Sequence, residues 1–287
     1  MPGVSQAEIG GLFLAACRAE LAALKPGNVH VHAGGHSMEV AQFEAAAVAA
    51  APLIATSGLK VGERVRRAVE ASFAAAGCNT NLGILLLCAP LAAAAERTSP
   101  FGLRDRLRDV LNDLDKGDAA AVFAAIRMAN PGGLGSVPEQ DVASAPTTGL
   151  LEAMGLAADR DRIARAYVTD YAEIFDFGLP VLANARGQTS DPELAVTTLH
   201  MAYLAYFPDS HIARRHGPAV AEEVRIEARE RAPLWQPVAQ CNTLPGLLDF
   251  DAVLKRRSLN PGTTADFVVA TLFASTVCDA LGLSGAA

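Results

Sequence analysis

The stretch GCNTNLGILLLCAPLAAA at residues 77–94 joins a polar cluster directly to the most apolar run of the chain. No charged side chain occurs from 82 to 95, and leucine and alanine lose little conformational freedom in a helix. We therefore expect a helix over 82–96 that is buried in the centre of the fold. This run is interrupted by Pro90 and is shorter than the roughly 20 residues that a membrane-spanning helix needs.

The rest of the sequence extends this helical pattern. Of the 287 residues, 51% are hydrophobic and 6% aromatic, and runs of β-branched residues are scarce. Ser5 and Glu8 form a capping box ahead of a helix that ends near Leu24. Further helices are expected near 39–56, 61–76, 101–113, 118–128, 147–157, 160–177, 218–231, 247–256 and 264–281, with another that opens at Asp191. No alternating strand pattern, linker or repeat is found, so the sequence predicts one all-α domain over 1–287.

Charge and cysteine content limit the partners. A formal net charge of −7 argues against nucleic acid, whose binding depends on neutralising phosphates with Lys and Arg. The five cysteines lack CxxC spacing, so neither a disulfide framework nor a zinc site is expected. The first residues lack the pattern of a secretory signal. We expect a cytoplasmic protein with small-molecule ligands and no membrane partner, and the composition is compatible with a homodimer.

Pro-Gly pairs recur at 26–27, 131–132, 245–246 and 261–262, and three of them have asparagine nearby. Turn chemistry alone explains any one such pair, because proline and glycine suit the central positions of a turn. Several pairs flanked by amides and acids suggest in addition that these turns carry a site.

The cluster Asn79-Thr80-Asn81 stands where the apolar helix begins. Asparagine and threonine are common helix caps, which is a purely structural role. The same position also suits phosphate, because the free N–H groups and the dipole of a helix N-terminus favour negative charge. Both interpretations remain open from these residues alone.

Two further segments carry candidate ligands for phosphate. In LNPGTTADF at 259–267, Asp266 lies in the first turn of a helix, where an acid interacts favourably with the dipole or could hold a metal between phosphates. In PDSHIARRHG at 208–217, Arg214 and Arg215 are either a solvated charge run or a basic element for phosphate.

Three histidines, His30, His32 and His36, occur in the loop GNVHVHAGGH. A transition-metal site would need further ligands that the sequence does not place beside them. We favour a loop histidine that contacts substrate.

Taken in order, these segments resemble the triphosphoribosyl-dephospho-CoA synthase family. The segments that carry the resemblance are KPGNV at 25–29, GGH at 34–36, NTNLG at 79–83, DSHIARRHG at 209–217 and LNPGTTAD at 259–266. ANPGGLG at 129–135 and LLEAMGLAADRDRIARAY at 150–167 resemble connecting segments of an archaeal and methylotroph branch. The resemblance covers nearly the whole chain and implies an all-helical enzyme. Such an enzyme transfers a triphosphoribosyl group from ATP to 3′-dephospho-CoA and releases adenine.

The chain also departs from the better-known family pattern. Asn28 stands where that pattern has leucine, and His30 where it has aspartate. Met38 occupies an expected acidic position, with Glu39 one residue later, and Asn81-Leu82 replaces a His-Lys pair. The ATP end of the site therefore resembles the family in outline, whereas the acceptor is left open.

The resemblance and the demands of the reaction together assign roles. His36, Glu20 and Glu39 are expected to be catalytic, and Asp266 and Glu39 to hold Mg²⁺ beside the ATP phosphates. The expected nucleotide-binding residues are Lys25, Gly27, Asn28, Asn79, Thr80, Gly83, Asp209, Arg214, Arg215, Asn260 and Gly262.

Three other functions remain as alternatives. The chain could transfer a phosphoribosyl group, from ATP or phosphoribosyl diphosphate, to a pterin-type cofactor precursor. It could instead hydrolyse N-ribosyl bonds, or bind a nucleotide without catalysis.

Overall fold

The computed structural model describes residues 2–32, 39–130 and 144–283, and within these ranges it contains helices and no β-strand. The first half comprises α1 (Gln6–Ala22), α2 (Val40–Ile54), α3 (Val61–Ala76), α4 (Leu82–Glu96), α5 (Leu103–Asn112), α6 (Lys116–Ala129), α7 (Leu150–Ala157) and α8 (Arg162–Val168). The second half comprises the π-helix η1 (Glu173–Gly178), α9 (Leu179–Gln188), α10 (Pro192–Tyr206), α11 (Ser210–His216), α12 (Pro218–Glu230), the 3-10 turn η2 (Ala232–Leu234), α13 (Leu244–Arg256) and α14 (Gly262–Ala280). The predicted all-α class is confirmed.

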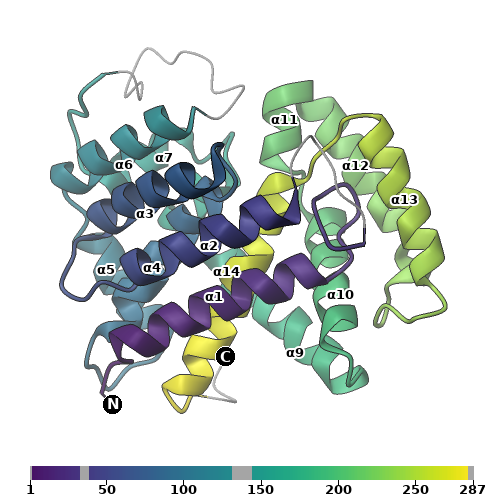
Figure 1. The fold of residues 1–287 in the computed structure, drawn as a ribbon, viewed down its shortest axis with the longest axis horizontal. Helices are drawn as coiled ribbons and strands as arrows, with labels where there is room; N and C mark the ends of the chain where they lie inside the picture. Colours follow the sequence, from purple (N-terminus) through teal and green to yellow (C-terminus); the bar gives the residue numbers. More distant parts are fainter. Residues whose placement is uncertain (1, 33–38, 131–143, 284–287) are drawn as a thin grey trace.

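Helix α4 is the core element that its composition predicts. Every residue of α4 is buried except Gly83 and Glu96, and α1, α2, α3, α5, α6, α8 and α14 pack around it (Figure 1). Full burial of one leucine side chain contributes about 1.5–3 kcal/mol, so the leucines of α4 make it a main source of stability.

A proline inside α4 creates a need for outside hydrogen-bond donors. Pro90 has no N–H to offer the carbonyl of Leu86, four residues earlier. The hydroxyl of Tyr167 donates to that carbonyl at 2.7 Å, and the hydroxyl of Tyr171 donates to the carbonyl of Leu87 at 3.2 Å. Both tyrosines are buried, so these bonds satisfy backbone groups that water cannot reach.

The prediction of one continuous helix over 160–177 is wrong, because the helix is interrupted in its middle. Asp170 and Tyr171 have φ angles of 48° and 56°, which end α8 and turn the chain before η1 begins. This turn accompanies the contact of both tyrosine hydroxyls with α4. Tertiary packing therefore overrides the helical pattern of the sequence here.

The other predicted helices are confirmed to within a few residues, and those over 61–76 and 82–96 match in full. Two further helices, α9 and α11, were not expected from the sequence. Helix α11 covers only Ser210–His216, which is too short to show a clear apolar period.

The central position of α14 brings the two halves of the chain together. It packs against α1 and α4 on one side and against α10, α11 and η1 on the other (Figure 1). A second hydrophobic cluster lies among α10, α12 and α13 and includes Leu24 and Leu259. The N-terminal end of α14 thus lies where loops from both halves meet. The single-domain boundary over 1–287 stays a prediction.

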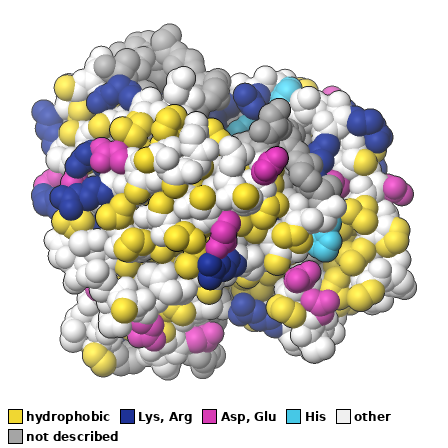
Figure 2. Space-filling model, viewed as in Figure 1, with side chains coloured by type: hydrophobic (Ala, Val, Ile, Leu, Met, Phe, Trp, Pro, Cys, Tyr) yellow, Lys and Arg dark blue, Asp and Glu magenta, His cyan; other side chains and the backbone are white. Residues whose placement is uncertain are grey.

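Figure 2 shows one face of the molecule, formed largely by α1, α2 and α3, over which hydrophobic side chains are widely spread. An ion pair between Arg18 and Glu44, 2.6 Å from Nη2 to Oε1, joins α1 to α2. Among the described residues, no helix combines the length and apolar character needed to span a bilayer.

The tyrosine contacts make a prediction about stability. Tyr167→Phe leaves the buried carbonyl of Leu86 without a partner and should lower the free energy of unfolding by about 1–3 kcal/mol. In a Pro90→Ala background the new N–H can serve Leu86, so the same change should cost clearly less. Thermal or urea unfolding of the four proteins of this cycle measures the coupling, and equal costs in the two backgrounds would contradict the explanation.

Candidate active site

Two turns that are distant in sequence contact each other at the start of α14. The side-chain amide of Asn28 donates from Nδ2 to Oδ1 of Asn260 at 2.8 Å, and both residues are buried. One turn follows α1 and the other precedes α14, so this bond joins the KPGN and NPG segments. The structure therefore brings together the first and last segments that the sequence singles out.

Gly27 allows this close approach. Its φ is 84°, in the left-handed region that glycine tolerates, and a Cβ at this position would lie 2.8 Å from Cδ of Pro261. Its N–H donates to Oδ1 of Asp251 in α13 at 2.8 Å. Packing between the turns thus accounts for this glycine without a bound ligand.

Glu20 and Lys25 form a buried ion pair at the end of α1. Lys25 also donates from Nζ to Oδ1 of Asn28 at 3.2 Å, and its side chain has no exposed surface. Burial raises the pKa of Glu20 and lowers that of Lys25, while the charge of each partner opposes the shift. In this arrangement Lys25 does not reach a triphosphate directly, and Glu20 is engaged as its counter-ion.

Asp209 fastens two helices together. Its Oδ1 accepts from the N–H of Ile212 at 3.0 Å, and its Oδ2 accepts from the N–H of Thr264 at 2.7 Å. The side chain thereby caps α11 and holds the first turn of α14. Both oxygens are used in this way, so the structure gives Asp209 a positioning role.

Asp266 lies against the beginning of α4. A Cβ at Gly83 would be 2.0 Å from Oδ2 of Asp266, so the carboxylate occupies space that only glycine leaves open. Asp266 is partly buried and accepts no hydrogen bond from the described residues. Burial, followed by the nearby charges of Asp209 and Glu20, raises its pKa well above the ordinary value.

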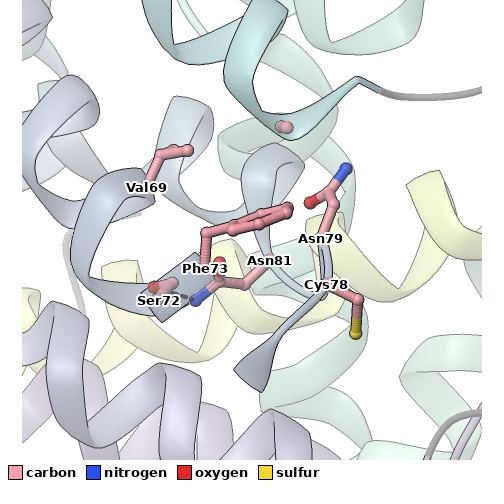
Figure 3. Close-up of a pocket in the computed structure, with 7 residues that line it drawn as sticks. Val69, Ser72, Phe73, Cys78, Asn79 and Asn81 are labelled. Carbon is pink, nitrogen blue, oxygen red and sulfur yellow. Dashed lines mark hydrogen bonds between the residues drawn. The ribbon is translucent and has the colours of Figure 1, made fainter. Parts of the chain in front are cut away.

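The three polar residues before α4 have different roles. Asn79 accepts the N–H of Leu82 at 3.2 Å, whereas Asn81 turns toward α3 and donates to Oγ of Ser72 at 3.0 Å (Figure 3). The hydroxyl of Thr80 is buried without a hydrogen-bond partner. Asn79 thus accepts the first N–H of α4, and of these three described residues Thr80 is the one with a buried polar atom that lacks a partner.

The crevice drawn in Figure 3 is small. Its empty volume is about 150 Å³, and it is lined by Val69, Ser72, Phe73, Cys78, Asn79, Asn81 and Ala129. Ligand pockets usually measure about 300–1,000 Å³. This crevice is therefore too small to hold a nucleotide.

Arg214 and Arg215 differ in position. Arg214 donates from Nη1 to Oδ2 of Asp161 at 2.6 Å, and its Nε is buried without a partner. Asp161 in turn caps α8 by accepting the N–H groups of Ile163 and Ala164. Arg215 is exposed. Arg214 lies close enough to Asp266 for its positive charge to oppose the rise in the pKa of that carboxyl. Of the two arginines, Arg214 is therefore the better candidate for the site.

Three other residues that the sequence predicts for the site are Glu39, His36 and Gly262. Glu39 is exposed at the start of α2, where its N–H donates to Oε1 of Gln42 at 2.9 Å. His36 lies outside the described residues. Gly262 opens α14 beside His211, whose Nδ1 would lie 2.9 Å from a Cβ on Gly262.

The two described loop histidines, His30 and His32, are not grouped with further metal ligands. His30 is buried, with Nε2 3.4 Å from Oδ1 of Asp251 and also 3.4 Å from Nζ of Lys255, and burial lowers its pKa. Among the described residues, no three His, Cys, Asp or Glu side chains are grouped as metal ligands. A single carboxylate such as Asp266 can still hold Mg²⁺, because that ion takes most of its ligands from phosphates and water.

Sequence reasoning missed two acids that organise the site, Asp161 and Asp251. Asp161 has a detectable signal, since an aspartate just before an apolar helical pattern is a typical cap. Asp251 gives none, because it lies inside α13 and its contacts with Gly27, His30 and Lys255 depend on tertiary structure. Burial alone would raise the pKa of Asp251, but the hydrogen bonds from these groups outweigh burial and lower it.

An all-α frame, several helix N-termini and a partly buried carboxylate of raised pKa are features expected of an enzyme that binds an anion. Residues 6–284 match the model of the family described as ATP:dephospho-CoA triphosphoribosyl transferase, and the chain belongs to this family. It is therefore a pentosyltransferase by family, and the predicted resemblance is confirmed.

A solved structure supports the same relationship. The chain is similar to a protein of Archaeoglobus fulgidus that is assigned as a triphosphoribosyl-dephospho-CoA synthase. The two are 25% identical with a TM-score of 0.63, and the match covers 81% of this chain and 97% of the archaeal one. No curated protein matches the sequence.

The contact between Gly83 and Asp266 makes a prediction about activity. Gly83→Ala should displace the Asp266 carboxylate and lower kcat/KM with ATP by roughly 100-fold, the typical loss when a reacting group moves by about 1 Å. Steady-state kinetics and thermal unfolding measure both effects of the change.

Gly11→Ala is the matched control, because a Cβ at Gly11 in α1 would meet nothing within 4 Å. It should keep full activity and gain about 0.5–1 kcal/mol of stability. Normal activity of Gly83→Ala would mean that the position of Asp266 does not matter to the reaction.

Proposed function

We propose that this chain transfers the triphosphoribosyl group of ATP to a hydroxyl of 3′-dephospho-CoA at the N-terminal end of α14, with release of adenine. The observation that supports this site most strongly is the meeting of four separate segments there. Asn28 reaches Asn260, Gly83 adjoins Asp266, and Asp209 holds Thr264. The family to which the chain belongs supports the reaction.

The reaction breaks the bond between adenine and C1′ of the ribose, and the acceptor oxygen forms a new bond to C1′. Adenine leaves with the electron pair and takes up a proton, while the acceptor hydroxyl loses one. Positive charge develops on the sugar in the transition state, so nearby carboxylates lower the barrier. Asp266 is our first candidate for such a carboxylate, and Glu20, which is paired with Lys25, is the second.

The triphosphate needs hydrogen-bond donors and positive charge. Side chains already accept the N–H groups of Leu82 and Thr264, and we propose that other N–H groups in the first turns of α4 and α14 bind phosphate, as helix N-termini often do. The hydroxyls of Thr80 and Thr264 and the Nε of Arg214 are buried without hydrogen-bond partners, which supports their use by a ligand. Asn79 and Arg215 are retained as weaker candidates for phosphate contacts.

The donor set fits Mg²⁺. Asp266 is a partly buried carboxylate whose oxygens accept no hydrogen bond from described residues, and its raised pKa means that its negative charge is poorly compensated. We propose that Asp266 holds the ion, with Glu39 as a second candidate. Bound Mg²⁺ would neutralise part of the triphosphate charge.

The proton of the acceptor hydroxyl needs a base. His36 and Glu39 remain our proposals for this role. In sequence, both lie between the Lys25–Asn28 turn and the beginning of α2.

One assay tests the reaction. Purified protein is incubated with ATP, Mg²⁺ and 3′-dephospho-CoA, and adenine and the ribosylated product are followed by chromatography and mass analysis. We expect one adenine for each product formed. Turnover with phosphoribosyl diphosphate and no adenine from ATP would reject the proposed donor, and adenine release without a ribosylated acceptor would identify a hydrolase.

Asp266→Asn tests the metal site. Loss of the charge should lower kcat/KM by about 100-fold or more, comparable to removing one preorganised charge-stabilising group. It should also weaken the dependence of ATP turnover on Mg²⁺ concentration. Wild-type turnover with an unchanged Mg²⁺ dependence would remove Asp266 from this role.

The same substitution should raise stability, in contrast to its effect on activity. Below the ordinary Asp pKa of 3.8 the folded and unfolded states are both protonated, so Asp266 has no pH-dependent effect there. Above it, the unfolded state loses its proton first, so the wild-type protein loses stability as pH rises toward the raised folded pKa. Melting temperatures in metal-free buffer should therefore favour Asp266→Asn more at pH 8 than at pH 4.

A cytoplasmic location and a homodimer stay predictions. The five cysteines are free thiols, which is compatible with a reducing compartment. Sedimentation or light scattering of the purified protein measures the oligomeric state.

A further inference from the structure

Four buried polar side chains form a continuous chain of hydrogen bonds from α1 to the start of α14. Glu20, Lys25, Asn28 and Asn260 have exposed fractions of 3%, 0%, 6% and 9%. Lys25 bonds to Glu20 and donates to Oδ1 of Asn28 at 3.2 Å, and Asn28 donates from Nδ2 to Oδ1 of Asn260 at 2.8 Å. This chain ends at the turn that opens α14.

The chemistry of the donors decides which side chain donates and which accepts in each of these hydrogen bonds. A lysine ammonium and a backbone N–H can only donate. Oδ1 of Asn28 receives both the Lys25 ammonium and the N–H of Val29, the latter at 2.8 Å. Asn28 must therefore present its oxygen to them and its NH₂ group to Asn260.

Asn260 must then present its oxygen to Asn28, which turns its own NH₂ group away from that contact. This Nδ2 donates to no described residue and is not among the buried polar atoms that lack a partner. It stands two residues before α14, whose first turn contains the unpartnered hydroxyl of Thr264. The outward face of the Asn260 amide is thus a hydrogen-bond donor.

We propose that Asn28 is a positioning residue that sets the direction of the Asn260 amide, so that Asn260 offers a donor to an oxygen of the bound triphosphate. Lys25 acts through Asn28 and does not contact the ligand. The identity of the ligand rests on the proposed function, whereas the direction of the amide does not. The arrangement gives a reason for burying a lysine at this point, because its ammonium helps to hold Asn28 in one orientation.

Asn28→Asp reverses the direction of the chain while keeping the shape of the side chain. The introduced carboxylate still accepts from Lys25 and Val29. It has no hydrogen to donate, so it must accept from Asn260 too. Because Asn260 now has to donate to the carboxylate through its NH₂ group, its amide must turn and face the ligand with its oxygen. Inorganic tripolyphosphate, measured by calorimetry with Mg²⁺ present, should bind at least about tenfold more weakly, as expected when a bond to a charged group is lost. The KM for ATP should rise by a similar factor, and the melting temperature should not fall.

Asn81→Asp is the matched control for the added charge. Asn81 is also 6% exposed, and it donates to Ser72 in the wall between α3 and α4, outside the chain of bonds. Tripolyphosphate affinity should fall by a clearly smaller factor in this variant. Equal losses in the two variants, or unchanged affinity in Asn28→Asp, would overturn the proposal.

Asn28→Leu provides a neutral second variant, with Asn81→Leu as its control. Both remove one buried amide, so both should lower the melting temperature, but Asn28→Leu should weaken tripolyphosphate binding by a clearly larger factor. A wild-type protein that does not bind tripolyphosphate would also overturn the proposal. If binding shows the expected differences but ATP releases no adenine, the proposed reaction fails and the positioning role of Asn28 stands.

Discussion

One amide–amide hydrogen bond joins two turns that lie 232 residues apart in the chain. The rest of the site depends on this contact, because it sets the end of α1 against the beginning of α14. Gly27 leaves room for the two turns to touch, and Asp209 holds α14 against α11 from the other side. Asn28, Gly27 and Asp209 therefore position the proposed site through contacts within the protein.

The carboxylate of Asp266 lies where its negative charge is poorly compensated. Burial, followed by the charges of Asp209 and Glu20, raises its pKa, and the hydroxyls of Thr80 and Thr264 and the Nε of Arg214 are buried without partners. Each such group costs free energy that a bound cation or phosphate would relieve. The core offsets this cost elsewhere, through the leucines of α4 and the tyrosine bonds to its carbonyls. Stability and function are thus separated between the middle of the bundle and the ends of its helices.

Much of the fold follows from local sequence. The helix over 82–96 is predictable because no other element suits so long a run of leucine and alanine, and the helix over 61–76 because it is clearly amphipathic. The break at Asp170 and Tyr171 is not predictable, since it accompanies hydrogen bonds from Tyr167 and Tyr171 to carbonyls of α4, a distant helix. The ordered motifs indicate which segments meet, but not which side chains are buried. For this reason Lys25 and Gly27, expected to bind nucleotide, prove to be packed inside the protein. Asp251 could not be found at all, because its partners lie on other elements.

The central claim is that separated helix beginnings form one site for an anionic nucleotide. Hydrogen exchange of backbone amides, measured with and without Mg-ATP, tests it most directly. Residues 79–84 and 260–266 should become protected together and over the same range of ATP concentration, while α12 stays unchanged. Protection of only one segment, or of neither, would contradict the account.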